Sequence, residues 1–294
     1  MESTCCIAAV APASECDVQG ECLRLQQICL DALRYEALAW PKPGLVTPVD
    51  SGSHRDMNIG TLLASIDALR GSFAQLAAAG ASARPFSVLQ QIGIAAEREM
   101  LSATSGINTH RGAIFNLGLL VAAAARRQQD AALHGLHCGE VVARVWGAEI
   151  AASRASSPVS HGSKVFEKYA AGGARAEAVG GFATLYNIGL PALRRALAAG
   201  HDRESALLAT LLVLMAYLPD TNLLWRGGES GLEFVRESAA AFNRAGGVET
   251  AGWRERLLAL HREFVTRNLS PGGSADLMAA CWVAHQLELN FSAG

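Results

Sequence analysis

The sequence predicts an all-α protein, and three observations lead to this fold class. Alanine and leucine, which favour helices, are abundant, and runs of β-branched residues are scarce. Half of the 294 residues are hydrophobic, which is enough for one large core. Apolar residues recur at helical spacing along most of the chain. We therefore expect a loose arm at residues 1–18 and a single multi-helix bundle at 19–294, whose polar inter-helix loops form a functional site.

The composition excludes some classes of function. The net charge of −2 argues against a general nucleic-acid binder. No basic region precedes an apolar stretch at the N-terminus, and the longest apolar run, Ala206–Leu218, is shorter than the roughly 20 residues that span a bilayer. The seven cysteines form no C-x-x-C pair. We expect a cytoplasmic protein with reduced thiols, no nucleic-acid or membrane partner, and an alanine-rich surface that could form a homodimer.

The first helix is expected at residues 20–39. Its apolar stripe of Cys22, Leu25, Cys29 and Ala32 continues at helical spacing to Glu36. A carboxylate on an apolar face is costly unless it is paired, so Glu36 indicates either a structural salt bridge or a place in a site. Pro41 and Pro43 then end the helix.

A Ser/Gly-rich loop at 50–58 comes before the second helix. Its His54-x-Asp56 spacing suits metal binding or acid–base work, and the alternative is an ordinary N-cap by Asp56 or Asn58. Apolar periodicity from Ile59 to Leu76 predicts one continuous second helix. The third helix is expected near Ser87, where Ser87-x-x-Gln90 fits a capping box.

The organising stretch of the chain is 97–116. Glu97 lies beside the buried stripe of the third helix, Thr104-Ser105-Gly106 breaks the helical pattern, and the fourth helix resumes at Ala113. Between them, Asn108-Thr109-His110-Arg111 crowds polar side chains between two apolar helices. Buried polar groups cost stability unless they are hydrogen-bonded, which favours a site over the alternative of a capped helix–helix turn.

Five helices and two polar segments follow. A helix carries Val141 to Ile150, residues 202–218 form a helix that is apolar nearly all round and so suits the bundle centre, and further helices are expected at 229–245 and 251–268 before a last one. Between them lie a second His loop at 160–164 and a Gly-Gly stretch at 172–177. Glycines before a helix allow an anion to approach the backbone.

Oxygen ligands cluster near two helix starts. Asp220 and Asn222 follow the apolar helix at a spacing that suits magnesium. Ser274 and Asp276 precede the last helix, where they also fit an N-cap and a first-turn acid. Cations share the polar loops, which suggests phosphate binding or, alternatively, simple solvation. These cations are Lys42, Arg55, Arg111, Lys164, Arg175 and Arg226.

Six loop segments, taken in this order, resemble the triphosphoribosyl-dephospho-CoA synthase family, over about residues 30–285. The segments are Pro41–Val46, Gly52–Met57, Thr104–Gly112, Ser160–Gly162, Asp220–Asn222 and Ser270–Asp276. The chain departs from the family in one glycine-rich segment, where Ala176 stands in place of the second glycine of Gly-Ala-Arg-Gly-Glu.

The resemblance implies an all-α enzyme that uses ATP and 3′-dephospho-CoA. The 2′-hydroxyl of 3′-dephospho-CoA would attack the anomeric carbon of the ATP ribose and expel adenine. The product, 2′-(5″-triphosphoribosyl)-3′-dephospho-CoA, would pass to a transferase that loads the acyl carrier protein of malonate decarboxylase or, less favoured, of citrate lyase. Magnesium would neutralise the triphosphate.

Breaking a glycosidic C–N bond builds positive charge on the sugar, which carboxylates stabilise. We assign catalysis to His54, Asp56, Glu97, His110 and Asp220, without choosing the general base. The expected Mg²⁺ ligands are Glu97, Asp220, Asn222 and Asp276. The expected substrate contacts are Lys42, Arg55, Asn108, Thr109, Arg111, His161, Lys164, Arg175, Arg226 and Ser274.

Two other classes of function stay open at this point. The same acidic loops would suit a Mg²⁺-dependent, all-α phosphohydrolase or a glycohydrolase of ADP-ribose-like compounds, with water as the nucleophile. A helical adaptor that docks an acyl carrier protein is a non-enzymatic alternative, but it leaves the polar loops unexplained.

Overall fold

The computed structural model describes residues 15–153 and 172–291, and this part of the chain is helical, with no strand. The predicted all-α class is confirmed. The α-helices are α1 (Glu15–Leu38), α2 (Ile59–Ala68), α3 (Ser72–Ala81), α4 (Phe86–Ala103), α5 (Arg111–Gln128), α6 (Cys138–Ala152), α8 (Gly173–Val179), α9 (Leu190–Ala198), α10 (Arg203–Tyr217), α11 (Thr221–Arg244), α12 (Trp253–Thr266) and α13 (Gly272–Phe291).

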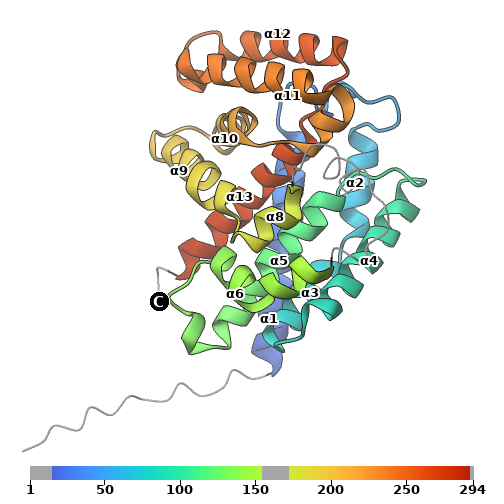
Figure 1. The fold of residues 1–294 in the computed structure, drawn as a ribbon, viewed down its shortest axis with the longest axis vertical. Helices are drawn as coiled ribbons and strands as arrows, with labels where there is room; N and C mark the ends of the chain where they lie inside the picture. Colours follow the sequence, from blue (N-terminus) through green and yellow to red (C-terminus); the bar gives the residue numbers. More distant parts are fainter. Residues whose placement is uncertain (1–14, 154–171, 292–294) are drawn as a thin grey trace, which may run out of the picture.

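Helix α5 forms the middle of the bundle, where it packs against α1, α3, α4, α6 and α13 (Figure 1). Small side chains allow this crowding: a Cβ on Gly80 of α3 would collide with the backbone of Ala122 in α5. The predicted apolar helix is α10, which is buried along most of its length but packs to one side, against α9, α11 and α13. Close backbone packing, more than hydrophobicity, therefore decides which helix is central.

The predicted second helix is wrong in one respect, because residues 59–76 form two helices. Gly71 stands between α2 and α3 with a φ of 101°, a conformation that only glycine adopts readily. Asn58 caps α2 in a capping box with Thr61, as one of the sequence alternatives predicted. The predicted capping box at Ser87 is wrong, since α4 already starts at Phe86 and Pro85 supplies no side-chain cap.

Helix α11 starts earlier than the sequence predicts. It begins at Thr221 and bends at Gly228, whose φ is 64°, before the predicted start of the helix at 229. In the described part of the chain, no single helix could cross a membrane by length and composition. Only α10 and α11 together pass that test, and this pair is bent by 57°.

The helices divide into two groups that leave their ends facing a common space. In Figure 1, α2, α3 and α4 lie on one side, α9 and α10 lie on the other, and α11 and α12 run side by side across the top. Helices α5 and α13 pack together between these groups. Cys22, Cys29, Cys138 and Cys281 are buried free thiols, as expected for core residues.

The break between α2 and α3 yields a stability prediction. Gly71→Ala should lower the free energy of unfolding by about 1–3 kcal/mol, because alanine is strained at this φ although no atom lies within 4 Å of the added Cβ. Gly20→Ala is the control: its Cβ also meets no atom, but it stands within α1 and should be neutral or slightly stabilising. Urea unfolding measures both, and equal shifts would contradict the strain argument.

Candidate active site

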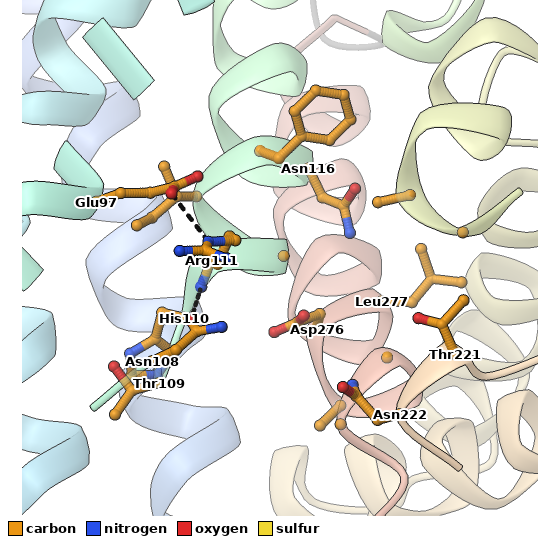
Figure 2. Close-up of a pocket in the computed structure, with 18 of the residues that line it drawn as sticks. Glu97, Asn108, Thr109, His110, Arg111, Asn116, Thr221, Asn222, Asp276 and Leu277 are labelled. Carbon is orange, nitrogen blue, oxygen red and sulfur yellow. Dashed lines mark hydrogen bonds and ion pairs between the residues drawn. The ribbon is translucent and has the colours of Figure 1, made fainter. Parts of the chain in front are cut away.

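A cavity of about 1570 Å³ opens where α4, α5, α11 and α13 face one another. Figure 2 shows its polar end, with Arg111 and Glu97 on one wall, Thr221 and Asn222 on the other, and Asp276 between them. Most of the residues predicted for the site line this cavity. They are His54, Asp56, Glu97, Asn108, Thr109, His110, Arg111, Arg175, Asp220, Asn222, Arg226 and Asp276.

Three long helices begin at this cavity. The first residues of α5, α11 and α13 are Arg111, Thr221 and Gly272, and all three line it. The first turn of a helix has backbone N–H groups without helical partners and the positive end of the helix dipole. Three such ends around one space form an environment suited to an anion such as a phosphate.

Asp276 is held close to the start of α5. A Cβ on Gly112 would collide with the Asp276 carboxyl group, so only glycine at this position allows the approach, and the Ala113 backbone N–H donates to the carboxyl group. Burial raises the pKa of Asp276 well above its ordinary value, and the negative charges of Glu36 and Asp220 raise it further. Asp276 is therefore a carboxyl group that holds a proton strongly.

The buried Glu36 has a partner of its own. The Lys42 ammonium is fully buried, lies 2.6 Å from the Glu36 carboxylate, and also donates to the Glu36 backbone carbonyl. Glu36 lines the cavity, whereas Lys42 does not. Both sequence alternatives for Glu36 thus hold together, since it forms a salt bridge and borders the site. Lys42, which we expected to hold phosphate, instead neutralises this carboxylate.

Asp220 connects the starts of two helices. Its Oδ1 accepts from the Asn222 backbone N–H at 2.9 Å, and its Oδ2 accepts from the Ser274 backbone N–H at 2.8 Å and the Ser274 hydroxyl at 3.0 Å. Burial raises the pKa of Asp220, and these hydrogen bonds oppose the rise. Asp220 therefore caps α11 and holds α13 beside it, and Ser274, which does not line the cavity, serves this contact.

His54 is placed by a chain of hydrogen bonds. Arg226 donates to His54 Nδ1 at 3.1 Å, so the ring proton is on Nε2, which lies 2.9 Å from the Ser270 hydroxyl. Burial and the Arg226 charge lower the pKa of His54 to about 4. His54 is neutral at pH 7, and Asp56, whose side chain is 64% exposed, lies at the rim.

His110 has one ring nitrogen engaged and one without a partner. Thr109 donates to the Ser65 hydroxyl, which is 2.7 Å from His110 Nδ1 and so donates to it, leaving the ring proton on Nε2. Nε2 is buried and has no hydrogen-bond partner among the described residues. Burial is the main cause that lowers the pKa of His110 to about 4. The ring is therefore neutral and offers an unused donor in the cavity wall.

The loop between α4 and α5 holds its polar residues in place. Glu97 accepts from Arg111 Nε at 2.9 Å, and the Asn108 side chain accepts from the Arg111 backbone N–H at 3.3 Å (Figure 2). Both members of the Glu97–Arg111 pair are partly exposed to the cavity. The loop is therefore both a turn between two helices, which was one sequence alternative, and part of the cavity wall, which was the other.

The other predicted residues are distributed as follows. Arg55 is exposed and does not line the cavity. Arg175 lines it and donates to the Ser153 hydroxyl at 2.6 Å. His161 and Lys164 lie outside the described residues.

Several lining residues were not predicted. Asn116 is buried in α5 and its amide oxygen has no partner, while Thr221, Trp225 and Ser270 complete the walls. An amide within the apolar pattern of residues 113–124 was the available signal for Asn116. Thr221 and Ser270 lie inside motifs whose neighbours were selected, and nothing in the pattern marked Trp225.

These features define an all-α protein with a cavity suited to an anionic small molecule, in which carboxyl groups lie beside helix N-termini. The sequence model of the ATP:dephospho-CoA triphosphoribosyl transferase family, CitG, matches residues 22–293. The chain belongs to this family, as the six loop segments predicted.

Individual relatives agree with the family match. A protein of Pseudomonas paraeruginosa is 42% identical over 94% of this chain and 93% of its own length, and one of Pseudomonas fluorescens Pf-5 is 41% identical over 90% and 91%. Both are named probable 2-(5″-triphosphoribosyl)-3′-dephosphocoenzyme-A synthase. A protein of Pectobacterium atrosepticum with that name, without "probable", is 41% identical over 90% of this chain and 89% of its own. No solved structure matches significantly.

Because Asp220 accepts hydrogen bonds from the starts of both α11 and α13, its removal should destabilise the fold more than the loss of an ordinary helix cap. Asp220→Ala should lower the free energy of unfolding by about 2–4 kcal/mol, because two helix starts lose an acceptor in a buried place. Asp202→Ala is the matched control, since Asp202 caps only α10 at an exposed site and should cost about 1 kcal/mol. Equal losses in urea unfolding would contradict the double cap.

The raised pKa of Asp276 predicts how stability depends on pH. Above the ordinary Asp pKa of 3.8, the unfolded chain releases a proton that the folded chain keeps, so this group makes stability fall as pH rises towards its folded pKa. Asp276→Asn removes the effect, and should gain stability relative to wild type by at most about 1.4 kcal/mol per pH unit above about pH 4. Urea unfolding across pH measures the difference, in which the histidine contributions cancel. A constant difference would contradict the shift.

Proposed function

We propose that this chain transfers the 5-triphosphoribosyl group of ATP to the 2′-hydroxyl of 3′-dephospho-CoA and releases adenine. The hydroxyl oxygen forms a bond to the anomeric carbon of the ATP ribose, and the bond from that carbon to adenine N9 breaks. The electron pair of the broken bond leaves with adenine, which gains a proton as the hydroxyl loses one. The triphosphate stays on the sugar throughout.

Family membership over nearly the whole chain supports this reaction, together with relatives named as the synthase. The observation that carries it in the structure is Asp276, a carboxyl group with a raised pKa that is placed where three helix N-termini meet. The positive ends of helix dipoles stabilise a bound polyphosphate, and a carboxylate stabilises a developing sugar cation. Both are present within one cavity.

Asp276 takes the hydroxyl proton in this proposal. It acts in its ionised form, in which a carboxylate with a raised pKa is a stronger base than a surface Asp and its negative charge stabilises the developing sugar cation. Glu36 is engaged in its ion pair with Lys42. Asp220 has three hydrogen bonds and acts by fixing the helix starts.

His110 serves the leaving group. Its Nε2–H is the unpaired donor in the cavity wall, so it can hydrogen-bond a ring nitrogen of adenine as negative charge builds there. With a pKa of about 4, His110 donates this hydrogen bond as a neutral ring at pH 7. Burial fixes that charge state.

The polyphosphate charge of ATP is met by Arg226 and the starts of α11 and α13. No group of three or more His, Cys, Asp or Glu in the described residues could hold a metal unaided. The carboxylate and amide oxygens of Asp220 and Asn222 do fit Mg²⁺, which is commonly held by one or two protein ligands plus substrate phosphates. When bound, Mg²⁺ would neutralise the triphosphate.

Purified protein, ATP and 3′-dephospho-CoA test the proposal. Adenine should appear only when both substrates are present, and mass spectrometry should find the triphosphoribosyl product. Asp276→Asn should lower kcat by at least about 100-fold, the lower range for a lost general base. Asp67→Asn is the control, because Asp67 is exposed on α2 and pairs with Arg34.

Other products would point elsewhere. Release of phosphate or ADP from ATP without the acceptor would favour a phosphohydrolase, and release of free triphosphoribose would favour a glycohydrolase. Binding of an acyl carrier protein without any turnover would favour the adaptor. Each of these outcomes overturns the proposed transfer.

We further propose that the product goes to a transferase acting on the acyl carrier protein of malonate decarboxylase, with citrate lyase as the alternative. We place the enzyme in the cytoplasm, where ATP is made, so that its product is available to this transferase. We also propose that the chain acts as a homodimer. Offering the product and a transferase to both carrier proteins distinguishes the two pathways. Sedimentation analysis measures the number of copies.

A further inference from the structure

The cavity continues beyond its polar end as an apolar trench. On the α4 wall it is lined by Phe86, Leu89, Gly93 and Ile94, and on the α5 wall by Phe115 and Leu119. Along α4, the lining runs from Glu97 back to Phe86, which is about 16 Å at 1.5 Å per residue. Gln90 is the one polar α4 side chain in that interval among the described lining residues.

Gly93 leaves this trench open. A Cβ added to Gly93 would meet no atom of residues 15–153 and 172–291 within 4 Å, so packing between these helices does not explain a glycine there. Gly118 on α5 differs, because its Cβ would contact Leu76. Glycine within a helix costs about 1 kcal/mol relative to alanine, and the gain at Gly93 is free space in the cavity.

The two substrates of the proposed reaction differ in what could fill such a space. Adenine of ATP is bonded to the reacting carbon, so it stays beside Asp276 and cannot extend along the trench. Both phosphate chains carry charge, which an apolar wall disfavours. The long uncharged portion is the pantetheine arm of 3′-dephospho-CoA, which is joined through a pyrophosphate to the far side of the ribose from the 2′-hydroxyl.

We propose that the apolar trench between α4 and α5 binds the pantetheine arm of the acceptor, with its pyrophosphate at Arg111. Arg111 suits this place because it lies at the start of α5, next to Glu97, where the polar end of the cavity passes into the trench. ATP then takes the opposite side, near Arg226 and the starts of α11 and α13. This inference rests on the proposed function and adds the position of each substrate.

Gly93→Leu tests the assignment, because leucine fills the trench and favours the helix. The KM for 3′-dephospho-CoA should rise at least about tenfold, equivalent to about 1.4 kcal/mol of lost contact, while the KM for ATP stays within about twofold. Isothermal calorimetry should show the same loss of acceptor binding. Gly20→Leu is the matched control, since Gly20 is exposed on α1 and away from the cavity.

The outcomes separate the two proposals. A wild-type protein that releases no adenine refutes the proposed function. If wild type is active, a Gly93→Leu variant with unchanged KM for the acceptor, or with a raised KM for ATP instead, refutes the trench assignment alone. Gly93→Ala adds a smaller side chain and should give an intermediate rise, so a folding defect in the leucine variant does not leave the question undecided.

Discussion

The structure depends on placing carboxyl groups inside a helical bundle, and the closest approach is that of Asp276 to Gly112. The absence of a side chain at Gly112 lets α13 bring its carboxyl group against the start of α5. There the backbone N–H groups and the helix dipole partly offset the cost of burial. A side chain at Gly112 would displace the Asp276 carboxyl group from this position, so the geometry of the site depends on this glycine.

The three carboxyl groups differ in how the surrounding residues compensate their charge. Glu36 is neutralised by Lys42, and Asp220 is satisfied by hydrogen bonds from Asn222 and Ser274. Within the described part of the chain, Asp276 has neither a cation nor a full set of donors. Burial without compensation raises the pKa of a carboxyl group, and in its ionised form such a group is a stronger base. This difference singles out Asp276 as the proposed base.

The helices and the site loops could be predicted from periodicity and from polar residues between apolar stretches, but the partners of those residues could not. Gly71 leaves the apolar period intact while its φ splits the helix, and Lys42 looks like other loop cations although it pairs with Glu36 six residues earlier. Ser274 and Asp276 stand in one motif, yet Ser274 lies inside α13 and donates to Asp220 instead of capping the helix, while Asp276 lines the cavity. Pairing depends on tertiary contacts, which a local pattern does not contain.

Transfer of a sugar to a hydroxyl competes with transfer to water, and a large cavity does not exclude water by size. Binding energy from a part of the acceptor remote from the reaction can position the hydroxyl and displace water from the path of attack. A trench that runs about 16 Å from Glu97 to Phe86 offers such remote contacts. Contacts between the apolar trench and the acceptor arm therefore favour transfer of the sugar to the acceptor hydroxyl over transfer to water.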